Sequence, residues 1–188
     1  MIMELYHPVI VLGPPRSGTS NIARILSRDF GLKMFRRPFV GQNLDLDGVQ
    51  EDLELAFSTN AFNADLITLP EWWEEFTAFI DDMYSLGVPW GFKEPRLGPL
   101  VFRVLKFLPG AILIRCIRSR AETVHSMMRK LSWPKEVAEK FYDLSHNSLD
   151  FALARRPHLR VQYRPGKRFP EKEIIKHISR IEAVRFAV

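Results

Sequence analysis

The stretch PVIVLGPPRSGTS, residues 8–20, carries the strongest fold signal in the chain. Its first five residues form an apolar run typical of a buried strand, and Gly13 follows that run at once. After the loop, apolar residues recur at helical spacing: Ile22, Ile25, Leu26 and Phe30. Gly31 then supplies a helix stop. A strand, a glycine-containing turn and a helix in this order are typical of a parallel sheet covered by helices.

The rest of the chain repeats this alternation. Further strands are predicted at 89–93, 111–117 and 158–163, and helices over 50–60, 70–86, 96–108, 120–130, from 134 onward, and over 170–183. Residues 31–48 are predicted to be a long loop. The chain contains no internal repeat, low-complexity tract or linker, so residues 1–188 are predicted to form a single domain. The expected class is α/β, a P-loop-type parallel sheet flanked by helices in three α/β/α layers.

The composition favours a globular protein that handles anions. Hydrophobic residues make up 46% and charged residues 26%, which is normal for a soluble domain. The formal charge is +5, and the arginines cluster around candidate loops rather than along one helix face, which favours a small multiply charged anion as the partner. No RNA-recognition motif is present and the aromatic residues do not interleave with a basic strip, so no nucleic acid partner is expected.

Cysteine usage and the N-terminal residues indicate the cellular compartment in which the protein is expected. Cys116 is the single cysteine, which excludes an internal disulfide and a cysteine-based metal site, and its apolar neighbours favour a buried, inert thiol. No cluster of metal ligands is apparent, so no metal is expected. Residues 1–13 are apolar but too short to span a bilayer, and they lack the basic leader and cleavage site of a signal peptide. We therefore expect a cytoplasmic protein without a membrane span.

The loop after the first strand is suited to hold phosphate, because a parallel sheet presents its ligand crevice at this place. The backbone amides from residue 17 to residue 20 would point at an anion from a helix N-terminus, whose dipole favours negative charge. The guanidinium of Arg16 adds bidentate contacts with oxyanions. The candidate binding residues are Gly13, Arg16, Ser17, Gly18, Thr19 and Ser20. The alternative is a strand–turn–helix junction capped by Ser17 or Thr19 that holds no ligand.

The position of the cation separates this loop from that of ATP- and GTP-binding proteins. A nucleoside-triphosphate P-loop carries lysine directly after its second glycine, where the side chain reaches the β- and γ-phosphates. Here that position is Thr19, and the cation of the loop is Arg16, two residues before Gly18. This departure argues against ATP or GTP. A small P-loop kinase or nucleotide hydrolase, and a catalytically degenerate nucleotide-binding relative, remain as alternatives.

These residues resemble the sulfotransferases that use 3′-phosphoadenosine 5′-phosphosulfate (PAPS). The family's 5′-phosphosulfate loop reads PRSGT or PKSGT, and residues 15–19 here read PRSGT, which is similar to the tyrosylprotein and bacterial branches. A second signature of the family is an arginine at the end of a strand with a serine eight residues later. The segment ILIRCIRSRAETVHS, residues 112–126, has Arg118 and Ser126 at that spacing. The resemblance implies that these two residues hold the 3′-phosphate of PAPS.

Two further segments extend the resemblance. GFKEPRLGPL, residues 91–100, resembles the GxKDPR segment of bacterial members, which implies that Lys93 faces the transferring sulfuryl group. The alternative for Lys93 is a surface Lys–Glu pair. DGVQEDLEL, residues 47–55, resembles the family's GYFED segment, which implies Glu51 as the general base, with Asp52 next. The alternative for Glu51 is a carboxylate that stabilises a helix N-terminus.

The resemblance implies transfer of a sulfuryl group from PAPS to a hydroxyl or amine acceptor. Arg16 and the loop amides would stabilise charge on the bridging oxygen, Lys93 would neutralise the equatorial sulfuryl oxygens, and Glu51 would take the acceptor's proton. The acceptor stays open between carbohydrate, peptide, lipid and small alcohol, and so does the oligomeric state. One helix is densely aromatic and could line an acceptor pocket, or form core or a subunit face: Trp72, Trp73, Phe76, Phe79 and Ile80.

Overall fold

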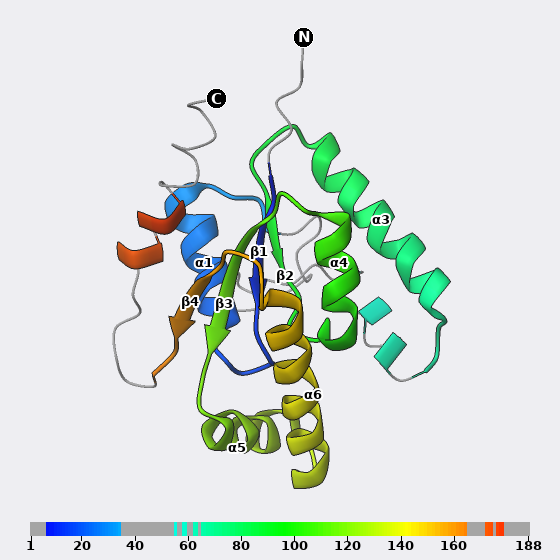
Figure 1. The fold of residues 1–188 in the computed structure, drawn as a ribbon, viewed down its shortest axis with the longest axis vertical. Helices are drawn as coiled ribbons and strands as arrows, with labels where there is room; N and C mark the ends of the chain where they lie inside the picture. The colour runs from blue at the N-terminus through cyan, green and yellow to red at the C-terminus, as the bar shows by residue number, and fades with distance from the viewer. Residues whose placement is uncertain are drawn as a thin grey trace.

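The structure is a computed structural model that describes residues 7–34, 55, 58–59, 62–63, 65–164, 172–174 and 176–178. Its elements, in chain order, are β1 (Val9–Leu12), α1 (Thr19–Phe30), α3 (Leu69–Ser85), β2 (Gly91–Lys93), the 3₁₀ helix η1 (Gly98–Leu100), α4 (Val101–Phe107), β3 (Ile112–Ile117), α5 (Arg120–Leu131), α6 (Lys135–Leu153) and β4 (Leu159–Gln162) (Figure 1). Among these helices, none combines the length and the apolar character that crossing a bilayer requires.

The four strands form one parallel sheet in the order β2-β1-β3-β4. Strand β1 is central, with Val9 opposite Gly91 of β2 on one side and Ile112 of β3 on the other. Because all strands run in the same direction, their carboxyl ends meet at one edge of the sheet, where α/β proteins bind ligands. The predicted α/β class with a parallel sheet flanked by helices is confirmed.

Helices cover both faces of the sheet. Alternate residues of β1 point to opposite sides, so this strand contributes apolar side chains to each face. Ile10 and Leu12 belong to a core shared with α3, α4 and α6, whereas Val9 and Val11 belong to a second core shared with α1. Figure 1 shows α1 on one side of the strands and α3 and α4 on the other. The sheet is therefore the middle layer of three, and its central strand is buried on both faces.

The aromatic helix α3 supplies much of the first core. Trp72, Phe76, Phe79 and Ile80 are at most 2% exposed. The rings of Trp72 and Phe76 stack with centroids 5.1 Å apart, and Phe79 meets Phe92 of β2 edge-on at 5.5 Å. These four residues are core residues, which decides among the interpretations left open by the sequence. Trp73 differs because it is only partly buried.

The helix predicted over 96–108 begins later than expected. The Leu97 amide donates to the Glu94 carbonyl (3.3 Å), and the Arg96 amide donates to the Glu94 carboxylate (2.9 Å). These bonds form a turn directly after β2, and η1 then leads into α4 at Val101. The side-chain carboxylate of Glu94 competes here with the helical hydrogen-bond pattern, as acidic side chains near chain turns often do.

Arg115 interrupts the apolar run of β3, and α6 explains how this charge is tolerated. The Arg115 side chain is 5% exposed. Its Nη1 forms an ion pair with Asp150 Oδ1 of α6 at 2.5 Å, and its Nη2 lies 3.4 Å from His146 Nδ1. A buried guanidinium is stable only when charged or polar partners compensate for its lost hydration. The pair thus connects α6 to the centre of β3.

The face of α6 that packs on the sheet is not its most apolar stripe. The buried residues of this helix are Ala138, Tyr142, Ser145, Leu149, Ala152 and Leu153. By contrast, Val137 and Leu144 are each 48% exposed and Phe151 is 73% exposed. The small residue Ser145 lies close to η1, since a Cβ at Gly98 would be 3.8 Å from its hydroxyl oxygen, and the Arg115–Asp150 pair is compatible with this orientation of α6.

Removing the Asp150 carboxylate is expected to destabilise the fold. Burial raises the pKa of Asp150, but the hydrogen bond and charge of Arg115 outweigh this effect, so the pKa lies below its ordinary value. The carboxylate therefore stabilises the folded state above the ordinary pKa of 3.8, and this contribution disappears as the pH falls through the lower, folded-state pKa. Asp150→Asn should lower the free energy of unfolding by about 1–2 kcal/mol near neutral pH, since Asp150 is half exposed.

Urea denaturation at neutral and acidic pH checks this prediction. The difference between wild type and Asp150→Asn should shrink in acid, because both proteins then lack the charge. Asp143→Asn is the matched control, since Asp143 pairs with Arg120, whose side chain is 46% exposed, and should lose less. Equal stability of Asp150→Asn and wild type at neutral pH would contradict the role given to this pair.

Candidate functional site

The candidate site begins at the carboxyl end of β1, where residues 13–18 lead into α1. Gly18 is the N-cap residue of α1, with a positive φ of 98° that glycine adopts readily. The amides of Asn21 and Ile22 donate to the Gly18 carbonyl at 3.1 and 3.4 Å, which starts the helical pattern. Helix geometry leaves the amides before them, those of Gly18, Thr19 and Ser20, without an intrahelical acceptor. These amides and the helix dipole favour an anion at this point.

Ser17 has a different place from its neighbours. Its amide donates to the Pro14 carbonyl at 3.2 Å and closes the turn of the loop. Its side chain is fully buried, and a Cβ at Gly13 would lie 2.6 Å from its hydroxyl oxygen. Ser17 therefore packs under the loop against Gly13, and its amide is already used within the loop. Of the four amides predicted to face an anion, the three of residues 18–20 remain at the start of the helix.

Arg16 reaches from the loop to the second predicted segment. Its φ of 69° lies in the left-handed region, which costs a non-glycine residue roughly 1–3 kcal/mol and is often found at functional sites. Its Nε donates to Ser126 Oγ of α5 at 3.2 Å, across 110 residues of sequence. Arg118 Nη1 donates to the Arg16 carbonyl oxygen at 3.0 Å. The predicted residues Arg16, Arg118 and Ser126 are therefore brought together at one edge of the sheet.

Tyr163, which the sequence analysis did not select, supports both parts of this cluster. It follows β4, and its amide donates to the Ile117 carbonyl at 2.7 Å. The Arg118 guanidinium lies 5.2 Å from the centre of its ring, within range of a cation–π contact. A Cβ at Gly18 would lie 2.9 Å from the Tyr163 ring, so glycine is required there for space as well as conformation. The available signal was position, since Tyr163 is the last residue of the strand predicted over 158–163.

Lys93 lies on the other side of the loop, at the end of β2. Its side chain is 1% exposed, and its Nζ donates to Ser20 Oγ at 3.2 Å. The neighbouring Glu94 forms a two-pronged pair with Arg96, at 2.5 Å to Nε and 2.7 Å to Nη2. The alternative interpretation of Lys93 as part of a surface Lys–Glu pair is therefore wrong.

Cys116 lies next to this cluster but is chemically inert. The thiol is buried, and burial raises its pKa, with the charge of Lys93 acting in the opposite direction. A thiol held in its protonated form is a poor nucleophile. Its backbone carbonyl lies against Gly13, where an added Cβ would come within 2.9 Å. The predicted buried thiol is confirmed, and its role is to pack below the loop.

The donor set of the site suits a multiply charged anion. It comprises the guanidinium groups of Arg16 and Arg118, the ammonium of Lys93, and the hydroxyls of Ser20 and Ser126. Within the described part of the chain, Arg118 Nε is buried without a hydrogen-bond partner and forms a long ion pair of 3.7 Å with the Glu122 carboxylate. Glu51 and Asp52 lie outside the described residues, so their predicted role as base stays a prediction.

Neither a family model nor a curated protein matches this sequence. Solved structures do match. The sulfotransferase STF9 from Mycobacterium avium has a TM-score of 0.61 and 15% sequence identity, over 98% of this chain and 64% of that one. The present chain thus spans less than two thirds of the length of STF9. The TM-score shows a shared fold.

Two other solved structures are similar at lower TM-scores. The sulfotransferase domain of the Synechococcus PCC 7002 olefin synthase has a TM-score of 0.49 and 16% identity, over 95% of this chain and 72% of that one. A putative kinase from Chloroflexus aurantiacus J-10-fl has a TM-score of 0.47 and 14% identity, over 93% and 98% of the two chains.

Proposed function

We propose that this chain transfers a sulfuryl group from PAPS to a hydroxyl or amine acceptor. The observation that carries the proposal is the contact between Arg16 Nε and Ser126 Oγ, together with the bond from Arg118 to the Arg16 carbonyl. These contacts join the two segments that resemble the 5′-phosphosulfate loop and the 3′-phosphate signature. The fold shared with the sulfotransferase STF9 supports the proposal.

The residues of the site fit a nucleotide with phosphate at both its 3′ and 5′ positions. The start of α1, with Arg16 beside it, suits the 5′-phosphosulfate. Arg118 and Ser126 lie next to it and suit a second phosphate, because a guanidinium and a hydroxyl both donate hydrogen bonds to phosphate oxygens. A single anion of low charge would neutralise only part of the positive charge that Arg16, Arg118 and Lys93 bring to this edge of the sheet.

The chemistry needs positioning and charge stabilisation more than covalent catalysis. The acceptor's oxygen or nitrogen forms a bond to sulfur while the bond from sulfur to the bridging oxygen breaks. The electron pair of that bond stays on the bridging oxygen, which leaves with adenosine 3′,5′-bisphosphate. Arg16 and the loop amides stabilise the growing charge on this oxygen, and Lys93 neutralises the sulfuryl oxygens. The acceptor's proton passes to a general base, for which Glu51 is the candidate.

A thermal-shift comparison tests the nucleotide and separates the proposal from its alternatives. Adenosine 3′,5′-bisphosphate should stabilise the protein, by about 2.7 kcal/mol when its concentration is a hundred times Kd. ATP with magnesium should give a much smaller shift, because the loop lacks the lysine that follows the second glycine in triphosphate-binding proteins. A larger shift with ATP and magnesium would favour a kinase or hydrolase, and no shift with either nucleotide would contradict a nucleotide site.

The variant Arg118→Ala tests which part of the chain binds adenosine 3′,5′-bisphosphate. This variant should lose most of the stabilisation by adenosine 3′,5′-bisphosphate, because a charge-assisted hydrogen bond to phosphate contributes about 1.5–3 kcal/mol. Arg155→Ala is the matched control, since Arg155 is exposed and follows α6. Without ligand, Arg118→Ala should melt below Arg155→Ala, because it also loses the bond to the Arg16 carbonyl and the contact with Tyr163, so the nucleotide shift of each variant is measured from its own ligand-free melting temperature. If adenosine 3′,5′-bisphosphate raised the melting temperature of Arg118→Ala as much as that of wild type, Arg118 would not be the residue that binds the 3′-phosphate.

A further inference from the structure

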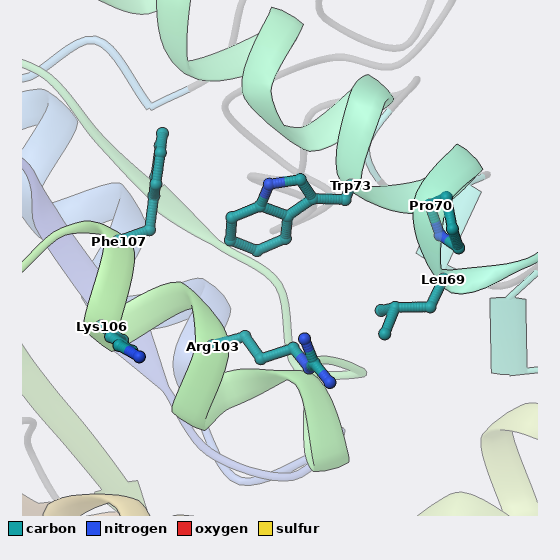
Figure 2. Close-up of a pocket in the computed structure, with 6 residues that line it drawn as sticks. All are labelled: Leu69, Pro70, Trp73, Arg103, Lys106 and Phe107. Atoms are coloured by element: carbon teal, nitrogen blue, oxygen red, sulfur yellow. The ribbon is translucent and has the colours of Figure 1, made fainter.

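A cavity of about 490 Å³ lies between α3 and α4, lined by residues that do not belong to the anion site. Its lining comprises Leu69, Pro70, Trp73, Arg103, Lys106 and Phe107 (Figure 2). Cavities that bind small molecules commonly have volumes of roughly 300–1,000 Å³. The size therefore suits a small organic molecule, and the lining determines its chemistry.

The wall of the cavity is aromatic and held in place. The rings of Trp73 and Phe107 meet edge-on with centroids 5.3 Å apart, and Trp73 also contacts the core residue Phe76 at 5.4 Å. Leu69 and Pro70 form the first turn of α3, which is fixed because the Thr68 amide donates to the Glu71 carboxylate at 2.6 Å. Phe107 is nevertheless 44% exposed, so the aromatic surface is accessible from the cavity.

Two positive charges flank this apolar wall. Arg103 and Lys106 lie three residues apart on α4 and therefore on one side of the helix. Figure 2 shows the Arg103 side chain extending from α4 into the space between Trp73 and Leu69. Both side chains are exposed, and within the residues that the structure describes no carboxylate pairs with either of them. A ligand with a negative group beside an apolar body would complement this arrangement.

We propose that the cavity between α3 and α4 binds an aromatic carboxylate. An aromatic ring can pack on Trp73 and Phe107 in the offset or edge-on geometries that such rings prefer. Its carboxylate can then accept hydrogen bonds from Arg103, whose planar fork matches a carboxylate, and receive charge stabilisation from Lys106. A purely apolar ligand would leave both cations unpaired, and an inorganic anion would leave the aromatic surface in water. The proposal does not depend on sulfuryl transfer.

Isothermal titration calorimetry with 2-naphthoate tests this site directly. The molecule has no hydroxyl or amine, so it reports on the cavity and not on turnover of an acceptor. Saturable binding is expected, and the neutral isostere naphthalene-2-carboxamide should bind about tenfold more weakly or worse, because it lacks the charge-assisted hydrogen bonds. Binding should persist when adenosine 3′,5′-bisphosphate is present at saturation, since the two sites share no residue.

Substitutions identify the residues involved. The double variant Arg103→Gln/Lys106→Gln should lower the affinity for 2-naphthoate about tenfold or more while leaving the weak binding of the amide unchanged. Lys135→Gln/Lys140→Gln, which removes two exposed cations from α6, is the matched control and should bind as wild type does. Trp73→Leu should weaken both ligands, and circular dichroism checks that each variant is folded.

Three results would overturn the proposal. They are the absence of saturable 2-naphthoate binding up to its solubility limit, equal affinity for the acid and the amide, and unchanged affinity in the Arg103→Gln/Lys106→Gln variant. None of these results bears on the thermal shift with adenosine 3′,5′-bisphosphate. The aromatic carboxylate site and the sulfotransferase function can therefore fail separately.

Discussion

Arg16→Ala is expected to lower kcat for sulfuryl transfer from PAPS by roughly 10²–10³, which corresponds to loss of one strong donor to charge that develops in the transition state. Arg16 belongs to the loop that precedes α1, and its guanidinium donates to Ser126 of α5, so it connects the loop to the second segment of the site. The bridging oxygen becomes negative only as the sulfur–oxygen bond breaks. The loss should therefore appear in kcat more than in the binding of the product nucleotide.

Arg16→Gly separates this catalytic effect from an effect on folding. Because Arg16 has a φ of 69°, glycine relieves the left-handed conformation while removing the guanidinium. We expect the free energy of unfolding of Arg16→Gly to stay equal to that of wild type or to rise by up to about 1 kcal/mol, while kcat falls as in Arg16→Ala. Arg155→Ala serves as the charge control. A kcat of Arg16→Ala close to that of wild type would contradict the assigned role.

Lys93→Met is expected to lower kcat by a similar factor, roughly 10²–10³, but to leave binding of adenosine 3′,5′-bisphosphate largely unchanged. Lys93 is buried at the end of β2, and its Nζ reaches Ser20 at the start of α1. The proposed function assigns it to the sulfuryl oxygens, and these are absent from adenosine 3′,5′-bisphosphate. Methionine keeps much of the side chain's length and apolar stem, so the variant removes the charge with little change in packing.

Steady-state kinetics and the thermal shift together check Lys93→Met. Lys140→Met, at an exposed position of α6, is the control for the loss of one positive charge. Loss of the nucleotide shift in Lys93→Met would show that the residue binds the 5′-phosphate instead, and an unchanged kcat would exclude it from the reacting centre. The contrast with Arg118→Ala, which should lose nucleotide binding, distinguishes the two cations.

Local patterns in the sequence predicted most of the described elements. Residues 8–12 alternate between the two faces of the sheet, and every position is buried, as a continuous apolar run indicates for a central parallel strand. The predicted start of α4 was less accurate, since the Glu94 carboxylate accepts a hydrogen bond from the Arg96 amide and the helix begins later in the chain. Such a side-chain bond depends on one rotamer and leaves no periodic pattern in the sequence.

The buried face of α6 does not include all of its large apolar residues. Phe151 and Leu144 are exposed, while small residues such as Ala138 and Ala152 are buried. In this orientation Asp150 pairs with the buried charge of Arg115 on β3. Periodicity identifies which residues share a stripe, but the neighbouring element decides which stripe is buried.

By itself, the sequence determined the α/β class and the strand–turn–helix order around the first loop, because both follow from backbone preferences within about a dozen neighbouring residues. Only the tertiary structure decided that Arg16 meets Ser126 across 110 residues, that Tyr163 supports both Gly18 and Arg118, and that Arg103 and Lys106 flank an aromatic cavity. Contacts between distant residues arise from the summed packing of whole strands and helices. No short window of sequence contains that sum.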